Sequence, residues 1–440
     1  MSDFENLPID DHSRQLLAEG GLRFGLVDTA DSDMVRRWLL AEDRGFHDPL
    51  PSDELLAAQA RDLQHDRVSG VWDPTSASPA DPIGTVRSWL MGLTVPGGDT
   101  VSAWAISAVT VAPTHRRRGI ARELLNSELR TAQRAGLPLA MLTVSEATIY
   151  SRFGFAPAAD QATLTIDTNR VRWTGPVPGG RLHIVPPSSL LDAAPAIFAR
   201  ARVRFPGEID RRPELWRYIL GLNPLKHGER DDLVAVRYDD EAGDLQGFAV
   251  YRFEHEKTGY PSRLHVTDLV AATDDAYAAL WRYLIEMDLI SEVHAPLRSI
   301  DEPVAWQVSD RRAVQKTNEH DQLWLRILDV PALLSERQYF APGAFVLTVS
   351  DNLGLADGEF LLTVDADGRG QAHPFSGADA PADAAHITLS IAELGALYLG
   401  GMSALVLARA GRVGEETTDA AARLDASFHS PYAPWVSTSF

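Results

Sequence analysis

One segment, residues 109–122 with the sequence VTVAPTHRRRGIAR, restricts the possible folds of this chain more than any other. The alternation in the preceding SAWAISAVTVAP predicts a strand that ends near Pro113. An apolar stripe predicts a helix that begins at Gly119 or Ile120, and its members are Ile120, Leu124, Leu125 and Leu129. Three consecutive arginines lie between the two elements, although the net charge is −20. In an acidic chain, such a cluster indicates a local site for an anion.

The start of this helix has the features of a phosphate site. The first four N–H groups of a helix are unpaired and carry a partial positive charge. Gly119 lets a ligand approach the backbone closely, and Arg117 and Arg118 add donors for a diphosphate. No Gly-Lys-Ser/Thr follows, so the segment is not a P-loop, and it lacks the glycines of a dinucleotide fingerprint. The alternative interpretation is a solvated arginine-rich loop that caps the helix.

Length and pattern divide the chain into three segments, which are 1–175, 176–325 and 326–440. At about 150 residues per domain, 440 residues correspond to roughly three domains. The second segment repeats the order strand, loop and helix in LHVTDLVAATDDAYAALWRYLIEMD, but without the arginines and the glycine. We therefore interpret it as a degenerate second copy of the first. The third segment, with FVLTVSD and GEFLLTVDADGRGQAH, is typical of an α+β layout with antiparallel hairpins, because its turns are too short for crossovers.

Composition excludes several classes of function. With no cysteine, the chain has no disulfide, no thiolate metal site and no cysteine nucleophile. The histidines His255, His265 and His294 lack the spacing of metal ligands, so no metal is expected. The charge of −20 argues against nucleic acid as a partner. The longest weakly charged stretch, residues 394–410, is too short to span a membrane, and the acidic N-terminus is unlike a signal peptide, so a cytoplasmic location is expected.

The arginine segment resembles the acetyl-CoA signature of the Gcn5-related N-acetyltransferases (GNAT), Arg/Gln-x-x-Gly-x-Gly/Ala. The matching residues are Arg116, Gly119 and Ala121. The resemblance implies that the strand end formed by Val109, Thr110 and Val111 pairs with the pantetheine amides. It implies that the pyrophosphate is held by residues 117–122, namely Arg117, Arg118, Gly119, Ile120, Ala121 and Arg122. The next strand would splay away and place Ser145 and Glu146 near the pantetheine arm.

Four further segments of the sequence are HRRRG, IYSRFGF, LWLRILDVPALL and LDASFHSPYAP. With them, the chain resembles more specifically the Eis family of actinobacterial acetyltransferases. The similarity spans nearly the whole chain. It implies a catalytic GNAT domain at 1–175, a degenerate GNAT-like domain at 176–325 and a sterol-carrier-protein-like α/β domain at 326–440. Members of this family assemble as hexamers, so a homo-oligomer is expected.

Two residues are candidates for catalysis. Tyr150 follows the splayed strand, where this family often places the acid for the coenzyme thiol, and a tyrosine of pKa about 10 is protonated at neutral pH. Spacing alone favours the alternative that Tyr150 packs against Phe153 and Phe155. The family also uses its C-terminal carboxylate as general base, which implies the α-carboxylate of Phe440. A frayed chain end is the alternative, but Trp435 and Val436 would anchor this segment.

The resemblance implies an acetyl-CoA-dependent N-acetyltransferase acting on small polycationic amines such as aminoglycoside-like compounds. Two alternatives remain, a protein or peptide acetyltransferase for lysine or N-terminal amines, and a non-catalytic binder of a hydrophobic ligand in the third segment. A narrow acceptor pocket would favour small molecules and an open groove would favour peptides. Trp38 and Trp89 lie where substrate pockets of this kind are often aromatic, and we interpret both as core residues.

Overall fold

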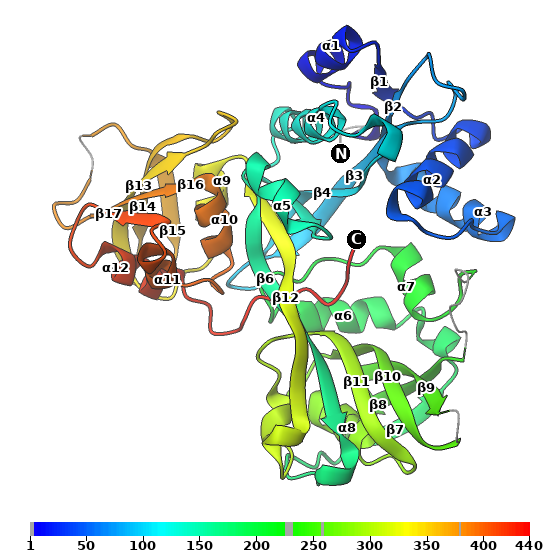
Figure 1. The fold of residues 1–440 in the computed structure, drawn as a ribbon. Coiled ribbons are helices and arrows are strands. Elements are labelled where there is room, and N and C mark those ends of the chain that lie inside the picture. The colour runs from blue at the N-terminus through cyan, green and yellow to red at the C-terminus, as the bar shows by residue number, and fades with distance from the viewer. Residues whose placement is uncertain (1–3, 225–231, 257–258, 378–379) are drawn as a thin grey trace.

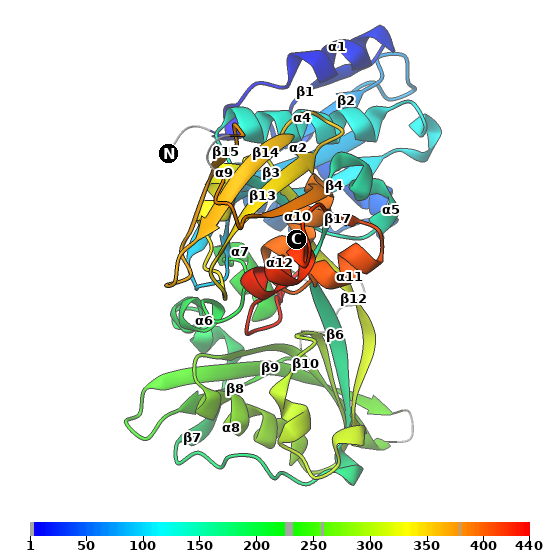
Figure 2. The ribbon, with the colours of Figure 1, turned by 90° about the vertical axis from the view of Figure 1, so that its left-hand side faces the viewer.

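The computed structural model describes residues 4–224, 232–256, 259–377 and 380–440. Within these residues the strands form one sheet of 12 strands and one of 5. Figures 1 and 2 show three lobes, with the N-terminal lobe above the middle one and the C-terminal lobe beside them. The predicted three-part α+β architecture is therefore observed, while the boundaries at 175/176 and 325/326 stay predictions.

The first lobe carries the predicted strand-to-helix transition. Its strands are β1 (Arg23–Leu26), β2 (Arg67–Trp72), β3 (Gly84–Thr94), β4 (Thr100–Val111) and β5 (Leu139–Thr143). Its helices are α1 (Asp11–Glu19), α2 (Ser32–Phe46), α3 (Asp53–Asp62), α4 (Ile120–Arg134) and α5 (Ala147–Tyr150). The predicted apolar stripe of α4 is at most 2 % exposed and packs in one core with Trp104 and Phe155. Burial of this stripe fixes the helix against β4, so the arginine loop projects from the end of the strand.

The second lobe repeats this order. Its strands are β7 (Arg181–Val185), β8 (Val234–Asp239), β9 (Leu245–Glu256), β10 (Gly259–Ala271) and β11 (Ile290–Arg298), and its helices are α6 (Ala194–Arg202), α7 (Pro213–Ile219) and α8 (Asp274–Ile285). β10 runs parallel to β11 across α8, as β4 runs parallel to β5 across α4. Thr273 caps α8 through the N–H of Ala276, and Asp274 and Asp275 follow in its first turn. Two carboxylates at this helix start repel a phosphate, which agrees with the predicted loss of the anion site.

Two long strands join the lobes, β6 (Ala156–Asp167) and β12 (Val314–Ile327). The strand order is β1-β2-β3-β4-β5-β12-β6-β11-β10-β9-β8-β7. β12, from the C-terminal end of the second segment, pairs with β5, and β6, from the first segment, pairs with β11. Each half of the sheet is thus completed by a strand from the other half of the chain (Figure 1).

The third lobe contains the smaller sheet. Its strands are β13 (Gly343–Ser350), β14 (Gly358–Val364), β15 (Gly370–Pro374), β16 (Ala385–Ser390) and β17 (Val413–Glu415), and its helices are α9 (Val330–Ser335), α10 (Ile391–Tyr398), α11 (Ala404–Arg409) and α12 (Ala420–Phe428). β13, β14 and β15 form the predicted antiparallel hairpins. The expectation of hairpins throughout is wrong for β16, which pairs parallel to β13. The β14–β15 hairpin lies between them in sequence and serves as the crossover that short turns could not supply.

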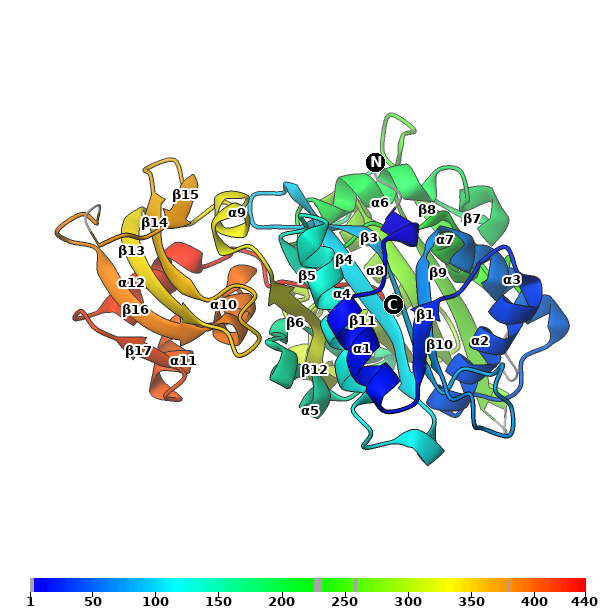
Figure 3. The ribbon, with the colours of Figure 1, turned by 90° about the horizontal axis from the view of Figure 1, so that it is seen from above.

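The third lobe is joined to the large sheet through α10, which packs on β6 and β12 (Figure 3). Arg326 of β12 donates to Asp351 at 2.6 Å, and both side chains are at most 1 % exposed. Gly154 lies under this contact with a φ of +79°, a conformation that favours glycine. A Cβ on Gly154 would lie 2.8 Å from both Arg326 Nε and Ile391 Cγ2.

Gly154→Ala is therefore expected to lower the free energy of unfolding by about 3 kcal/mol, from left-handed strain together with overpacking. Gly136→Ala is the matched control, because Gly136 has a φ of +76° and no neighbour within 4 Å of the added Cβ. The free energy of unfolding of this control should fall by only about 1 kcal/mol, because it has the left-handed strain without the overpacking. Urea denaturation of both variants gives the comparison, and equal losses would contradict this account of the contact.

Candidate active site

A cleft opens where β4 and β5 separate. The two parallel strands pair only at Trp104 with Ala140 and at Ala105 with Met141. Beyond these pairs lies a cavity of about 270 Å³. It is lined by Phe46, Ile106, Ser107, Ala108, Val109, Leu142, Thr143, Val144, Ser145, Tyr150, Gln322, Ser439 and Phe440. The predicted divergence of the two strands is thus observed, and the cavity brings Tyr150 together with Phe440, which lies far from it in the sequence.

A β-bulge shapes the β4 wall of this cleft. Ser107 pairs with Arg87 and Thr110 pairs with Thr85, so β4 carries one extra residue. Ala108, within the bulge, has a φ of +55°, which is uncommon outside glycine. A bulge increases the local twist and changes the direction of the following backbone. The alternating apolar pattern of β4 contained no signal for it.

The start of α4 forms the wall of a second cavity, of about 780 Å³. Gly119 adopts a φ of +78°, and the Glu123 N–H is bonded to the Gly119 carbonyl. The N–H groups of residues 120–122 therefore have no partner within the helix. The cavity is lined by Pro113, Arg116, Arg117, Ala121, Arg122, Asn126, Ile149, Arg152, Phe153 and Leu353.

Three of these arginines are free to meet an anion. Arg116, Arg117 and Arg152 form no ion pair with any residue in the described part of the chain, whereas Arg122 donates to Glu123 at 2.8 Å. Arg152 was not predicted as a site residue, although it belongs to the family-like segment IYSRFGF. Together with the helix N–H groups, these side chains can bind a diphosphate.

The side chain of Arg118 lies elsewhere. It donates to the Gly20 carbonyl at 3.1 Å and approaches Asp73 at 3.5 Å. The hydroxyl and N–H of Thr75, with smaller contributions from His115 and Arg118, hold the pKa of Asp73 well below its usual range. Asp73 is thus ionised at neutral pH and keeps Arg118 outside the set that lines the cavity.

Tyr150 is both a packing residue and a cavity residue. It is 8 % exposed, and its ring meets the ring of Phe155 edge to face at 6.1 Å, as the packing alternative expected. It also lines the cleft between β4 and β5. Burial raises the pKa of Tyr150, a hydrogen bond with Ser145 opposes this, and the charge of Glu146 adds to it. The hydroxyl therefore carries its proton at neutral pH and can donate it.

Phe440 is held at the end of β5. The Thr143 hydroxyl donates to a main-chain oxygen of Phe440 at 2.6 Å and accepts from the Phe440 N–H at 2.9 Å. The ring of Phe440 meets Trp89 edge to face at 5.6 Å, so Trp89, interpreted as a core residue, also borders the site. The Gln322 side chain donates to Ser439 at 2.7 Å.

The second lobe holds the chain just before this point. The Trp435 N–H donates to the Pro206 carbonyl at 2.8 Å, and its indole N–H donates to the Leu297 carbonyl at 2.9 Å. Arg211 donates to the Ser437 hydroxyl at 2.7 Å. Trp435 is 6 % exposed. The predicted anchoring of this segment is therefore confirmed, and the C-terminus lies between the first and second lobes (Figure 1).

Comparison with known proteins shows which family has this arrangement of domains. Residues 27–158 and residues 207–327 each match the family model described as "Acetyltransferase (GNAT) domain", and residues 330–437 match "Sterol carrier protein domain". The chain is 34 % identical over 411 residues to an uncharacterized N-acetyltransferase of Streptomyces avermitilis, covering 92 % of this chain and 96 % of that one. It is 35 % identical over 347 residues to N-acetyltransferase Eis of Mycobacterium tuberculosis, covering 77 % and 81 %. The chain belongs to the Eis family of N-acetyltransferases.

Solved structures agree with this membership. The crystal structure of Eis1 from Mycobacterium abscessus matches this Eis-family chain with a TM-score of 0.77 at 29 % identity, over 95 % of this chain and all of that one. A GCN5-related N-acetyltransferase from Anabaena variabilis has a TM-score of 0.78 at 19 % identity, which shows the shared fold alone. The predicted order of two GNAT domains followed by a sterol-carrier-protein domain is confirmed.

The predicted cofactor residues of this Eis-family enzyme fall into three groups. Those that line the two cavities are Val109, Ser145, Arg117, Ala121 and Arg122. Those that shape the adjoining backbone are Thr110, Val111, Gly119 and Ile120. The remaining two, Arg118 and Glu146, also line neither cavity. Their roles toward a cofactor stay predictions. Across the described residues there is no cluster of potential metal ligands, and no helix is long and apolar enough to cross a membrane.

Proposed function

We propose that this Eis-family enzyme transfers the acetyl group of acetyl-CoA to an amine of a small polycationic acceptor, of the aminoglycoside-like class. One observation carries the proposal. The cleft between β4 and β5 holds Tyr150 and Phe440, and the adjacent segment 149–153 also lines the arginine-rich cavity at the start of α4. A single extended ligand with a diphosphate and a thioester would reach both.

The arginine-rich cavity fits the diphosphate of coenzyme A. Arg116, Arg117 and Arg152 have no acidic partner among the described residues, and residues 120–122 offer unpaired helix N–H groups. Both features favour a ligand with several negative charges. Bound acetyl-CoA supplies an acetyl group activated as a thioester.

Tyr150 would hold the proton for the departing sulfur. Its buried hydroxyl is protonated at neutral pH and lines the cleft. Tyr150→Phe keeps the ring and its contact with Phe155 but removes the proton. We expect kcat to fall by about tenfold, because a thiolate whose acid has a pKa near 8.5 leaves even without full protonation.

The Tyr150→Phe variant should keep the KM for acetyl-CoA within about twofold, because the hydroxyl acts only on the departing group. The wild-type enzyme should lose rate at high pH as the tyrosine ionises, and the variant should lack that alkaline limb. Steady-state kinetics across pH test both expectations. An unchanged kcat would leave Tyr150 with a packing role alone.

The α-carboxylate of Phe440 would bind and orient the acceptor amine. A carboxylate of pKa about 3.5 is a weak base for an ammonium group, so its main contribution is a negative charge at a defined position. Its contacts with Thr143 fix that position beside Tyr150 in one cavity.

Charge and size support a small cationic acceptor. The net charge of −20 attracts cations to the enzyme. The cavity at Phe440 has about 270 Å³, which suits a single amine-bearing group. The second candidate is a protein or peptide amine, either lysine or an N-terminus.

A thiol-release assay with acetyl-CoA and a panel of amines tests the proposal. We expect turnover with polyamines and aminoglycoside-like compounds and little with lysine peptides. Faster turnover of peptides would favour the second candidate, and no thiol release with any amine would contradict the function. We also propose the homohexamer and the cytoplasmic location that the resemblance implies, and light scattering of the purified protein tests the hexamer.

A further inference from the structure

The degenerate second domain contains a cavity of its own, of about 490 Å³. β10 and β11 pair in parallel from Ser262 to His265 and then separate. The cavity is lined by the end of β10 at residues 269–271, by Arg298 at the end of β11 and by Asp274 and Tyr277 of α8. It therefore occupies the place in the second copy that the β4–β5 cleft occupies in the first. The two cavities share no lining residue.

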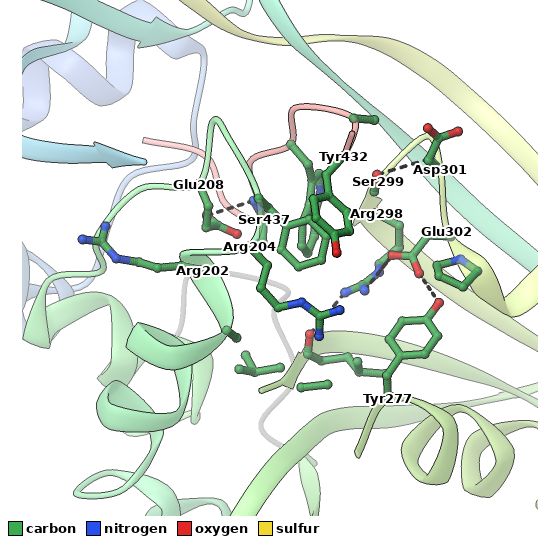
Figure 4. A pocket seen from close by; sticks show the side chains of 18 of the residues that line it. Arg202, Arg204, Glu208, Tyr277, Arg298, Ser299, Asp301, Glu302, Tyr432 and Ser437 are labelled. Atoms are coloured by element: carbon green, nitrogen blue, oxygen red, sulfur yellow. Dashed lines mark hydrogen bonds and ion pairs between the residues drawn. The ribbon is translucent and has the colours of Figure 1, made fainter. Parts of the chain in front are cut away.

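Aromatic side chains form much of the wall. Phe205 meets Trp435 edge to face at 5.5 Å and Tyr432 at 5.7 Å. The last two belong to the C-terminal segment, so residues 431–437 close one side of the cavity (Figure 4). Phe198 and Tyr277 also line it. Arg298 already lies over the Trp435 ring at 4.8 Å, and Arg204 lies 6.0 Å from the ring centres of Phe205 and Tyr432. The remaining faces and edges of the rings can meet an apolar group.

Three of the four arginines that line this cavity have acidic partners. Arg204 pairs with Asp274 at 2.7 Å, and Arg298 pairs with Glu302 at 2.7 Å. Arg211 makes two bonds to Asp268, at 2.7 and 3.1 Å. Arg202 points away from the other labelled side chains in Figure 4. Arg202 has no ion pair with the described residues, but it donates to the Thr100 hydroxyl at 3.2 Å and to the Gly92 carbonyl at 3.4 Å. The cavity thus offers an anion no guanidinium that is free of hydrogen-bond partners.

One buried carboxylate at the cavity, Glu208, has no ion pair with the described residues. Glu208 is 1 % exposed and accepts from the N–H groups of Ile209 at 3.1 Å and Ser437 at 3.3 Å. It forms no ion pair within 4 Å with any described residue. Burial raises the pKa of Glu208, and the charge of Arg211 partly offsets this. Asp301, at the same cavity, also has no ion pair with the described residues. A buried carboxylate without a cation is costly, so a ligand that supplies one is favoured.

We propose that the cavity between β10 and β11 binds a small organic ammonium ion with an aromatic body, its ammonium group at Glu208 and its ring against Phe205 and Trp435. The site is separate from the acetyl-transfer cleft and needs no acetyl-CoA. Its charge pattern, and not the general acidity of the chain, defines the ligand class.

Calorimetric titration of the full chain without acetyl-CoA tests the proposal with three matched probes, phenethylamine, 2-phenylethanol and 3-phenylpropanoate. We expect phenethylamine to bind more tightly than both others. Glu208→Gln keeps the shape and an oxygen for the two N–H groups but removes the charge. This variant should bind phenethylamine about tenfold or more weakly, which is the loss of affinity expected when a charge-assisted hydrogen bond becomes neutral. Asp192→Asn, at an exposed carboxylate of the same lobe, should leave binding unchanged.

Equal binding of the three probes, tighter binding of the anion, or unchanged binding to Glu208→Gln would overturn the proposal. If Glu208→Gln does not fold, soaked crystals of the wild-type protein decide instead. Density for phenethylamine with its nitrogen within hydrogen-bond distance of Glu208 supports the site. Density at the β4–β5 cleft alone, or none, overturns it. Because no acetyl transfer is measured, this result is independent of the proposed activity.

Discussion

Adding one glycine after Phe440 is expected to lower kcat by about a hundredfold or more, because misplacing a reacting group by an ångström or more has effects of this size. The added residue carries the α-carboxylate one residue further along the chain. The main-chain group of Phe440 that contacts Thr143 then becomes a neutral amide. The KM for acetyl-CoA should change little, since the phosphate cavity contains no residue after Leu353. Steady-state kinetics of the extended chain, with an acceptor that the wild type acetylates, measure both quantities.

Two variants separate the charge from the segment that carries it. Ser439→Ala removes the hydrogen bond from Gln322 but keeps the carboxylate of Phe440. It should lower kcat by less than about fivefold. Thr143→Val removes the hydroxyl that holds Phe440. Its loss of kcat should lie between the losses of Ser439→Ala and the extended chain. Full activity of the extended chain would remove Phe440 from the catalytic residues.

Replacing Arg116 and Arg117 together with alanine is expected to raise the KM for acetyl-CoA by about a hundredfold, with kcat changed less than about threefold. Each guanidinium makes charge-assisted contacts with phosphate, and partial solvent exposure reduces the contribution of each to about tenfold. Because the lost contacts are made equally in the ground and transition states, the effect falls on KM. Steady-state titration of acetyl-CoA gives the value.

Arg118→Ala is the matched control. The sequence predicted that Arg118 binds phosphate, but its side chain contacts Gly20 and Asp73. It should therefore raise the KM by less than about fivefold. A larger effect for Arg118 than for the Arg116 and Arg117 pair would show that the loop binds its ligand in another conformation.

Local signals explain why much of the first domain could be predicted from the sequence. The end of the strand near Pro113 and the start of the helix at Gly119 or Ile120 follow from periodicity, and the structure has β4 ending at Val111 and α4 beginning at Ile120. The resemblance extended these signals to the three-domain order. The bulge at Ala108 left no such signal, because alanine is an ordinary strand residue in this pattern.

Contacts between distant residues explain what was missed. Thr143 meets Phe440 across 297 residues, and Arg211 meets Ser437 across 226. Neither Thr143 nor Arg211 stands in a motif. The lobes that carry them are brought together by the exchange of β6 and β12 and by the bridge between Leu93 and Ile209. Such pairings depend on the packed topology, which periodicity along one segment does not contain.

A crystal structure of the enzyme with acetyl-CoA would show whether the start of α4 and the β4–β5 cleft form one coenzyme A site, as we claim. We expect the pyrophosphate at the N–H groups of residues 120–122 with Arg116 and Arg117, and the acetyl group in the cleft near Tyr150 and Phe440. Density for the coenzyme elsewhere on the protein, or no density at saturating concentration, would contradict the claim.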